Sequence, residues 1–296
     1  MMRSPSKIAV AVRRADGSVA TMEKPFVSVT RRIGFLGLPV VRGAVSLFET
    51  LYLGITALNF SAEEVAKADS KSEVKTSALY GAAQFLTLVL SLGLGLLLFV
   101  VLPARLTAWL GFHDRIRFGL VDGFFRLLAF VAYLVLISRW KELARVLGYH
   151  GAEHKAIHAL ENRAPLTLES VQSFSRFHPR CGTSFLFLLV VVSIVVFTFI
   201  GRPRGIGDHL LRIACMPLIA GVAFEFIRLS GKHADRMVVR ALVWPGLQFQ
   251  RLTTREPEPS MCEVAISALE RVRGDEAVVA LERAGTEARA EVAFIQ

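Results

Sequence analysis

Cysteine is scarce in this chain of 296 residues, and several familiar motifs are missing. The three cysteines are Cys181, Cys215 and Cys262; an odd number without a C-x-x-C pair gives no disulfide framework and no thiolate zinc knuckle. No G-x-x-x-x-G-K-[ST] segment is present, so a nucleotide site is not supported. Arg3 and Lys7 are not followed by an apolar segment, so we expect no cleavable signal peptide.

Acidic residues are also few relative to basic ones. The chain has 25 Asp and Glu against 35 Lys and Arg, a net charge of +10, and yet 53% of its residues are hydrophobic. A chain this apolar can bury enough surface to fold, which excludes intrinsic disorder. A basic nucleic-acid-binding protein is rarely this apolar, so we expect no nucleic-acid partner. The combination is typical of a membrane protein whose cations lie on one side of the bilayer.

Four apolar runs are long enough to cross the hydrocarbon core of a bilayer as helices. They are residues 79–102, 118–138, 183–200 and 210–229. The second run contains Asp122 and Arg126, which are four residues apart on one helix face and could neutralise each other.

A fifth apolar stretch, residues 33–60, is ambiguous because it contains Arg42, Glu49, Pro39 and several glycines. With four spans, the segments 1–78, 139–182 and 230–296 lie on one side and hold 11, 7 and 9 of the 35 Lys and Arg. This asymmetry predicts that both termini are cytoplasmic. A span over 33–60 would move a basic segment outside, so we expect this stretch to be interfacial or re-entrant.

The ends of the chain predict small soluble elements. In residues 1–30, two runs with period two flank Asp16-Gly17, which predicts a cytoplasmic β-hairpin. In residues 230–296 we expect a short strand at 247–253 and a helix that begins at Ser260. The predicted fold is mainly α: a polytopic helical membrane protein with about four spans (76–138 and 183–229), one interfacial or re-entrant segment (33–60), and small cytoplasmic α+β elements.

The loop 139–182 contains a histidine-rich segment that is typical of metal sites. If it is helical, His150, His154 and His158 recur every four residues along one face, with Glu161 close to the next turn. Two imidazoles one turn apart can bind one divalent metal, and a neighbouring carboxylate can activate a bound water. The order of His150, Glu153 and His154 matches H-x-x-E-H, the inverted zinc-protease motif, which makes Glu153 a candidate general base.

The predicted topology brings further groups to the same side of the membrane. His178 and Cys181 lie at the cytoplasmic mouth of the third span, and N and S donors favour zinc. Glu225, which we assign as a catalytic or ligating acid, lies near the cytoplasmic end of the fourth span. A carboxylate in a span is costly unless it is paired or functional. The secondary candidates on this side are His158, Glu161, Arg180 and His233.

Other interpretations of these residues stay open. The histidines could lie among lipid head groups without a metal, because short motifs often occur by chance. Cys181 could be a thiolate favoured by Arg180 and a helix N-terminus, or simply a small buried residue. Glu225 could form an ordinary ion pair with Arg228 or Lys232.

The chain resembles the YqhQ-like family of bacterial integral membrane proteins. The matching stretches are residues 1–5, 38–43, 57–62, 149–161, 178–183, 245–247 and 252–257. The resemblance implies a location in the bacterial inner (cytoplasmic) membrane and a metal-dependent protein, because the family is commonly described as a predicted metal-dependent enzyme. Family members usually carry a G-Q-A-V-x-E-G segment before the Met-Met-Arg sequence. If that Glu contributes to the site, this chain lacks one ligand.

Two classes of function follow from these observations. The first is a membrane-embedded metal-dependent protein, in particular a hydrolase, with zinc held by His150, His154, His178 and Cys181. The second is a non-enzymatic scaffold or assembly factor that binds anionic lipid or a partner membrane protein through its basic face. Transport is a weaker third hypothesis, because four spans with few polar groups make a poor pathway.

Overall fold

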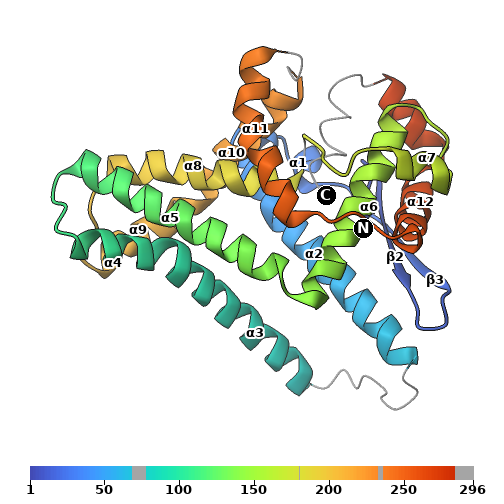
Figure 1. The fold of residues 1–296 in the computed structure, drawn as a ribbon, viewed down its shortest axis with the longest axis horizontal. Coiled ribbons are helices and arrows are strands. Elements are labelled where there is room, and N and C mark those ends of the chain that lie inside the picture. Colours follow the sequence, from blue (N-terminus) through green and yellow to red (C-terminus); the bar gives the residue numbers. More distant parts are fainter. Residues whose placement is uncertain (69–77, 180, 233–235, 284–296) are drawn as a thin grey trace.

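A helical bundle forms one half of the molecule, and a small cap of helices and strands forms the other (Figure 1). The computed structural model describes residues 1–68, 78–179, 181–232 and 236–283. The bundle contains α3 (Ala78–Leu96), the π-helical η2 (Leu97–Val101), α4 (Leu102–Trp109), α5 (Arg115–Ser138), α8 (Gly182–Ile200), α9 (Ile206–Ala214), α10 (Met216–Lys232) and α11 (Met237–Thr253).

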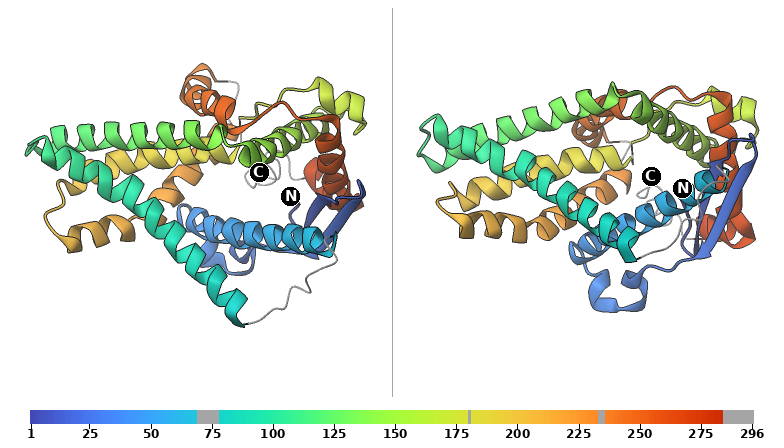
Figure 2. Two further views of the ribbon diagram at one scale, coloured as in Figure 1. Left: turned by 60° about the horizontal axis from the view of Figure 1, so that its bottom comes forward. Right: turned by 90° about the horizontal axis from the view of Figure 1, so that it is seen from below.

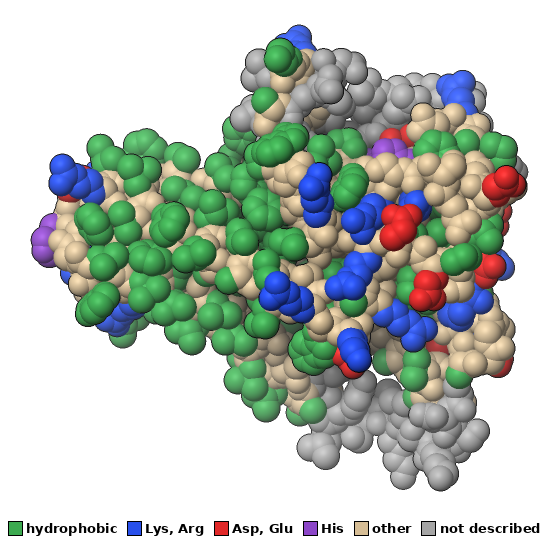
Figure 3. Space-filling view, viewed as in Figure 1, with side chains coloured by type: hydrophobic (Ala, Val, Ile, Leu, Met, Phe, Trp, Pro, Cys, Tyr) green, Lys and Arg blue, Asp and Glu red, His purple; other side chains and the backbone are tan. Residues whose placement is uncertain are grey.

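The four apolar runs are helical, as predicted. Asp114 caps α5 by accepting a hydrogen bond from the backbone of Arg117 (3.0 Å), and Gly201 ends α8 with a φ of 85°. Within the described residues, five helices are long and apolar enough to cross a membrane: Val41–Lys67, Gly81–Trp109, Arg115–Ser138, Gly182–Ile200 and Ile206–Ser230. Hydrophobic side chains cover the visible face of the bundle, whereas charged side chains gather over the cap (Figure 3). An apolar surface this wide is unusual for a protein in water and is the kind of face that binds a membrane or another protein.

A buried polar cluster joins three helices of the bundle. The carboxylate of Asp122 lies 2.9 Å from a guanidinium nitrogen of Arg126 and 3.4 Å from one of Arg212. Arg126 also donates to Ser193, and both guanidinium groups lie over the ring of Phe197. The predicted pairing of Asp122 with Arg126 is therefore confirmed, and the second cation leaves the cluster with an excess positive charge.

The ambiguous stretch 33–60 is not one element. It is divided between η1 (Gly34–Gly37), which follows α1 (Val29–Arg32), and most of α2 (Val41–Ala68). Helix α2 begins against α10 and runs toward the strands of the cap (Figure 2). Two ion pairs, Arg3–Glu49 (3.4 Å) and Arg14–Glu64 (2.6 Å), join it to the first 14 residues of the chain. Its outer face carries an exposed apolar stripe, which includes Phe48, Tyr52, Ile55 and Leu58.

The cap contains a three-stranded antiparallel sheet in the order β1 (Met2–Arg3), β2 (Lys7–Arg13) and β3 (Val19–Pro25). The predicted hairpin is confirmed, with Arg13 opposite Val19 and Gly17 at a φ of 85° in its loop. Helices α6 (Lys141–Glu161), α7 (Leu168–Ser173) and α12 (Pro259–Arg283) complete the cap. A core of small and aliphatic side chains, including Ala9, Ala152, Ala156, Val171 and Leu269, holds these elements together.

The predicted strand at 247–253 is wrong, because these residues form the last turns of α11. Phe249 and Leu252, three residues apart, pack together with Phe130 and Val190 of the bundle. Spacing of three residues places side chains on one face of a helix. The helix predicted from Ser260 is confirmed as α12; residues 284–296 of the predicted tail lie outside the described part of the chain.

Candidate metal centre

The histidine-rich segment forms α6, which continues from the C-terminal end of α5 after a break at Trp140. Its repeat of four residues places His150, His154 and His158 on one face, as predicted. This face lies against the loop that leads from α7 to α8. Three elements therefore meet at the junction of bundle and cap: α6, the 174–181 loop, and the end of α11.

The structure brings His150, His154 and Cys181 together in a first group of possible metal ligands. One donor atom from each residue lies within 4.8 Å of the donors of the other two. The thiol sulfur of Cys181 is 3.3 Å from Nε2 of His150, and the two imidazole centroids are 4.4 Å apart. Cys181 and His154 are completely buried.

Backbone carbonyls fix the orientation of both imidazoles in this group. Nδ1 of His150 lies 2.9 Å from the carbonyl oxygen of Thr253, and Nδ1 of His154 lies 2.6 Å from that of Arg176. Because a carbonyl can only accept, each Nδ1 carries a proton, so each imidazole can bind a metal only through Nε2. Among the described residues, the buried Nε2 of His154 has no hydrogen-bond partner. Buried polar atoms usually have a partner, so an unpaired ring nitrogen beside a thiol is a good candidate for a metal ligand.

A second group lies next to the first and consists of His158, Glu161 and His178. Nε2 of His178 is 3.3 Å from the carboxylate of Glu161, and Nε2 of His158 is 2.8 Å from the carbonyl oxygen of Phe177. The ring of His178 lies 4.7 Å from that of His158 and 5.8 Å from that of His154, between centroids. The four histidines thus form one continuous array. The Glu161 side chain, which is 26% exposed, lies at its open edge.

Two side chains of α11 hold the 174–181 loop in place. The amide group of Gln250 accepts from the backbone N–H of His178 (2.8 Å) and donates to its carbonyl oxygen (2.7 Å). The hydroxyl of Thr253 is 3.0 Å from that of Thr183, whose backbone N–H in turn donates to the sulfur of Cys181 (3.3 Å). Cys181 is therefore the N-cap of α8.

A glycine within the histidine motif allows the polypeptide after α11 to pass beside α6. The backbone N–H of Arg255 donates to the carbonyl of Leu147 (2.9 Å), and a β-carbon on Gly151 would collide with the carbonyl oxygen of Arg255. Gly151 is thus required for a close approach of two backbones, which also brings the Thr253 carbonyl to His150.

The electrostatics of the first group favour a thiolate. Burial alone would raise the pKa of Cys181, but the hydrogen bond with His150 and the nearby imidazole of His154 hold this pKa well below its ordinary value. Burial likewise acts to lower the pKa of His150, but the hydrogen bond and the charge of Cys181 raise it to about 9. In the second group, burial lowers the pKa of His178, and the hydrogen bond with Glu161 offsets this only in part.

Neither of the two predicted catalytic acids is a member of the two ligand groups. The carboxylate of Glu153 forms an ion pair with the N-terminal ammonium of Met1 (2.5 Å). The carboxylate of Glu225 accepts two hydrogen bonds from the guanidinium of Arg42 (2.7 and 2.5 Å) and a longer one from the backbone of Val40.

The other predicted residues fall into three sets. His150, His154 and Cys181 lie together, as the prediction required, whereas His178 joins the secondary candidates His158 and Glu161. Arg180 and His233 lie outside the described residues. Gln250 and Thr253 were not predicted, since their segment was taken for a strand. A helical reading of that segment would have placed both polar side chains within one turn of each other.

Comparisons with known proteins identify relatives without an assigned activity. The family described as "Protein of unknown function (DUF1385)" matches residues 38–275. The "Uncharacterized protein YqhQ" of Bacillus subtilis (strain 168) is 31% identical over 273 residues, which cover 87% of this chain and 84% of the relative. No solved structure matches the chain.

Proposed function

Since the chain belongs to the DUF1385 family, as its resemblance to YqhQ-like proteins predicted, we propose that it is a membrane-embedded metal-dependent protein. His150, His154 and Cys181 would hold the metal. The site would lie at the cytoplasmic face of the membrane, where the cap meets the bundle. Zinc is the best candidate, because two imidazole nitrogens and one thiolate match its preferred donors.

The observation that supports a metal most directly is the state of His154. Its Nδ1 is bound to a carbonyl, and its buried Nε2 has no partner among the described residues but lies beside His150 and Cys181. Leaving such a nitrogen unpaired costs roughly 1–3 kcal/mol. A bound cation would remove that cost. It would also stabilise the Cys181 thiolate, whose pKa is already low.

A hydrolytic reaction is the chemistry we propose for this centre. A zinc ion with three protein ligands keeps one position for a water molecule and lowers the pKa of that water. A proton acceptor must lie nearby. His178 is suited to this role because its lowered pKa keeps it neutral at pH 7, and Glu161 can stabilise the proton that it receives. Glu153 is less suited, because it is not a member of either ligand group.

The cytoplasmic placement rests on charge and on connectivity. Segments 1–78, 139–182 and 230–296 hold 27 of the 35 Lys and Arg, which favours the cytoplasmic side. The ion pairs from Arg3 to Glu49 and from Arg14 to Glu64 hold α2 beside the N-terminal sheet along about four turns. We therefore propose that α2 lies in the interface rather than across the bilayer, with both termini in the cytoplasm.

Metal analysis of the purified protein tests the proposal. Wild-type protein should contain about one equivalent of zinc, and His154→Ala should lose it. His113→Ala changes a histidine at the far end of the bundle and should keep the metal. A readout independent of activity is thermal unfolding: chelation should lower the midpoint of wild type and of His113→Ala, but leave that of His154→Ala unchanged. Metal-free wild-type protein that does not take up added zinc would refute the proposal.

One observation favours the alternative function, a scaffold that binds anionic lipid or a partner membrane protein. Arg31 and Arg32 are exposed in the last turn of α1, beside the exposed Ile33 and Phe35. Basic and apolar side chains together suit an anionic membrane surface. In this case, the double substitution Arg31→Glu and Arg32→Glu should abolish function, whereas His154→Ala should leave it intact. The metal hypothesis predicts the opposite ranking.

A further inference from the structure

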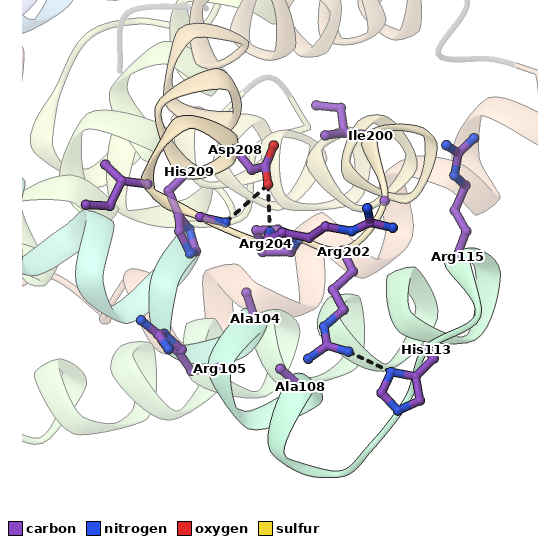
Figure 4. Close-up of a pocket in the computed structure, with 14 residues that line it drawn as sticks. Ala104, Arg105, Ala108, His113, Arg115, Ile200, Arg202, Arg204, Asp208 and His209 are labelled. Atoms are coloured by element: carbon purple, nitrogen blue, oxygen red, sulfur yellow. Dashed lines mark hydrogen bonds between the residues drawn. The ribbon is translucent and has the colours of Figure 1, made fainter.

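A pocket of about 890 Å³ opens at the end of the bundle that lies away from the histidine array (Figure 4). Helix α8 connects the two places, since it begins directly after Cys181 and its last residue, Ile200, lines the pocket. Its 19 residues span roughly 28 Å at 1.5 Å per residue. The pocket is therefore separate from the metal centre and lies near the opposite end of the bundle.

The lining of this pocket is strongly cationic. Six basic side chains from the α4–α5 and α8–α9 regions line it, namely Arg105, His113, Arg115, Arg202, Arg204 and His209. The only acidic side chain in its described lining is Asp208. Its carboxylate already accepts hydrogen bonds from the backbone N–H groups of Arg204 (2.6 Å) and Gly205 (3.3 Å). The single negative charge of Asp208 offsets at most one of the four arginines in the lining, so the pocket keeps a positive excess.

Most of these cations have unused donors. Within the described part of the chain, the guanidinium groups of Arg105, Arg115 and Arg204 form no hydrogen bond and no ion pair. The guanidinium of Arg202 donates to Nδ1 of His113 (2.6 Å), a neutral acceptor that leaves its charge uncompensated. Nδ1 of His209 is buried and has no partner among the described residues. The lining of the pocket therefore holds three guanidinium groups whose donors have no protein acceptor in the described part of the chain.

The buried cluster behind the pocket adds to its positive potential. Arg212 donates to the carbonyl oxygen of Gly201, a residue that lines the pocket. The charge of Asp122 is shared between Arg126 and Arg212, so this cluster contributes one net positive charge. In the low dielectric of the bundle this charge is weakly screened, and an anion in the pocket would balance it.

We propose that this pocket binds a phosphate group. One guanidinium group can donate two parallel hydrogen bonds to a phosphate. Four arginines line the pocket, and a phosphate has more acceptor oxygens for them than a single carboxylate. The phosphate could belong to a lipid head group or to a soluble molecule. Exposed apolar side chains flank the pocket, including Trp109 (83% exposed) and Ile206, which fits the interfacial depth at which lipid head groups lie.

The test compares two arginine variants of the full chain, purified in detergent and in lipid nanodiscs. The double substitution Arg202→Gln and Arg204→Gln removes two cations that line the pocket. The matched control Arg117→Gln removes an exposed cation at the same end of the bundle that is not part of the lining. Retention of bound zinc and a normal thermal midpoint in detergent would show that the variants are folded.

Two ligand arms distinguish the source of the phosphate. Inorganic phosphate is titrated calorimetrically in detergent. Thermal unfolding is compared in nanodiscs of phosphatidylglycerol and of phosphatidylcholine. If the ligand is soluble, wild type and Arg117→Gln bind inorganic phosphate, and the double variant binds it at least about tenfold more weakly, as expected for lost charged hydrogen bonds. If the ligand is a lipid, phosphatidylglycerol stabilises wild type and Arg117→Gln more than the double variant. The proposal is overturned if neither ligand distinguishes wild type from the double variant, or if Arg117→Gln is equally impaired.

Discussion

The side chain of Gln250 binds the backbone of His178 at two points, through an acceptor at 2.8 Å and a donor at 2.7 Å. The two residues are 72 positions apart, and both are completely buried. This pair connects the end of α11 to the loop that carries His178 and Cys181. The geometry of the candidate metal centre therefore depends on the packing of α11 in the bundle.

Replacing Gln250 by Ala should destabilise the protein and loosen the metal centre. The change removes the side-chain acceptor of the buried His178 N–H, a loss of roughly 1–3 kcal/mol, whereas the His178 carbonyl keeps the hydrogen bond from the backbone N–H of Cys181 (3.3 Å). The midpoint of thermal unfolding in detergent and the affinity for zinc should both decrease. Gln248→Ala is the matched control, because Gln248 lies on the same helix and makes no side-chain hydrogen bond among the described residues. Equal behaviour of the two variants would contradict a positioning role for Gln250.

Gly151 gives a second test of how the site is assembled. A methyl group at this position would meet the carbonyl oxygen of Arg255, so Gly151→Ala should push the chain after α11 away from α6. We expect a loss of about 1–3 kcal/mol in stability, the usual cost of overpacking, and weaker metal binding as the Thr253 carbonyl moves from His150. Gly54→Ala is the control, since nothing lies within 4 Å of the added atom. It should be neutral or gain up to about 1 kcal/mol from helix propensity. A stable Gly151→Ala protein with full metal content would contradict the close approach.

The pattern of the sequence accounts for much of the fold but for less of the site. Apolar runs predicted the helices of the bundle, because length and hydrophobicity are local properties. The Asp16-Gly17 turn likewise predicted the hairpin. The partners of Glu225 and of His178 were not predictable in this way. Arg42 is 183 residues from Glu225, and Gln250 reaches His178 only because α11 packs on α8. The strand predicted at 247–253 was wrong, because in so short a segment apolar residues three apart, such as Phe249 and Leu252, fit a helix as well as a strand.

The low pKa of Cys181 predicts a thiolate in metal-free protein at neutral pH. Because the folded protein binds this proton less tightly than the unfolded chain, the thiolate contributes stability above the ordinary pKa of 9.0. This contribution is lost as the pH falls through the lowered value. Ultraviolet thiolate absorbance should therefore persist at pH 7 in chelated wild type and disappear in Cys181→Ser. His150→Ala should move its titration to higher pH, because the main hydrogen bond to the sulfur is gone. Cys262→Ala is the control, since burial raises the pKa of Cys262 and its thiol stays protonated. An absorbance at pH 7 that survives in Cys181→Ser would refute the assignment.

The position of α2 can be tested by labelling from the two sides of the membrane. Single cysteines replace Ser18 at the hairpin tip, Lys67 near the end of α2, Ser173 at the end of α7, and Arg202 at the far end of the bundle. A membrane-impermeant thiol reagent is applied to intact cells and to inverted vesicles, with the parent chain as background. Because Arg14 binds Glu64 on the same turn as Lys67, positions 18 and 67 must lie on one side of the bilayer. We expect 18, 67 and 173 to react only in inverted vesicles and 202 only in intact cells. Reaction of position 67 in intact cells, with 18 still protected, would mean that α2 crosses the membrane and that the Arg14–Glu64 ion pair does not form.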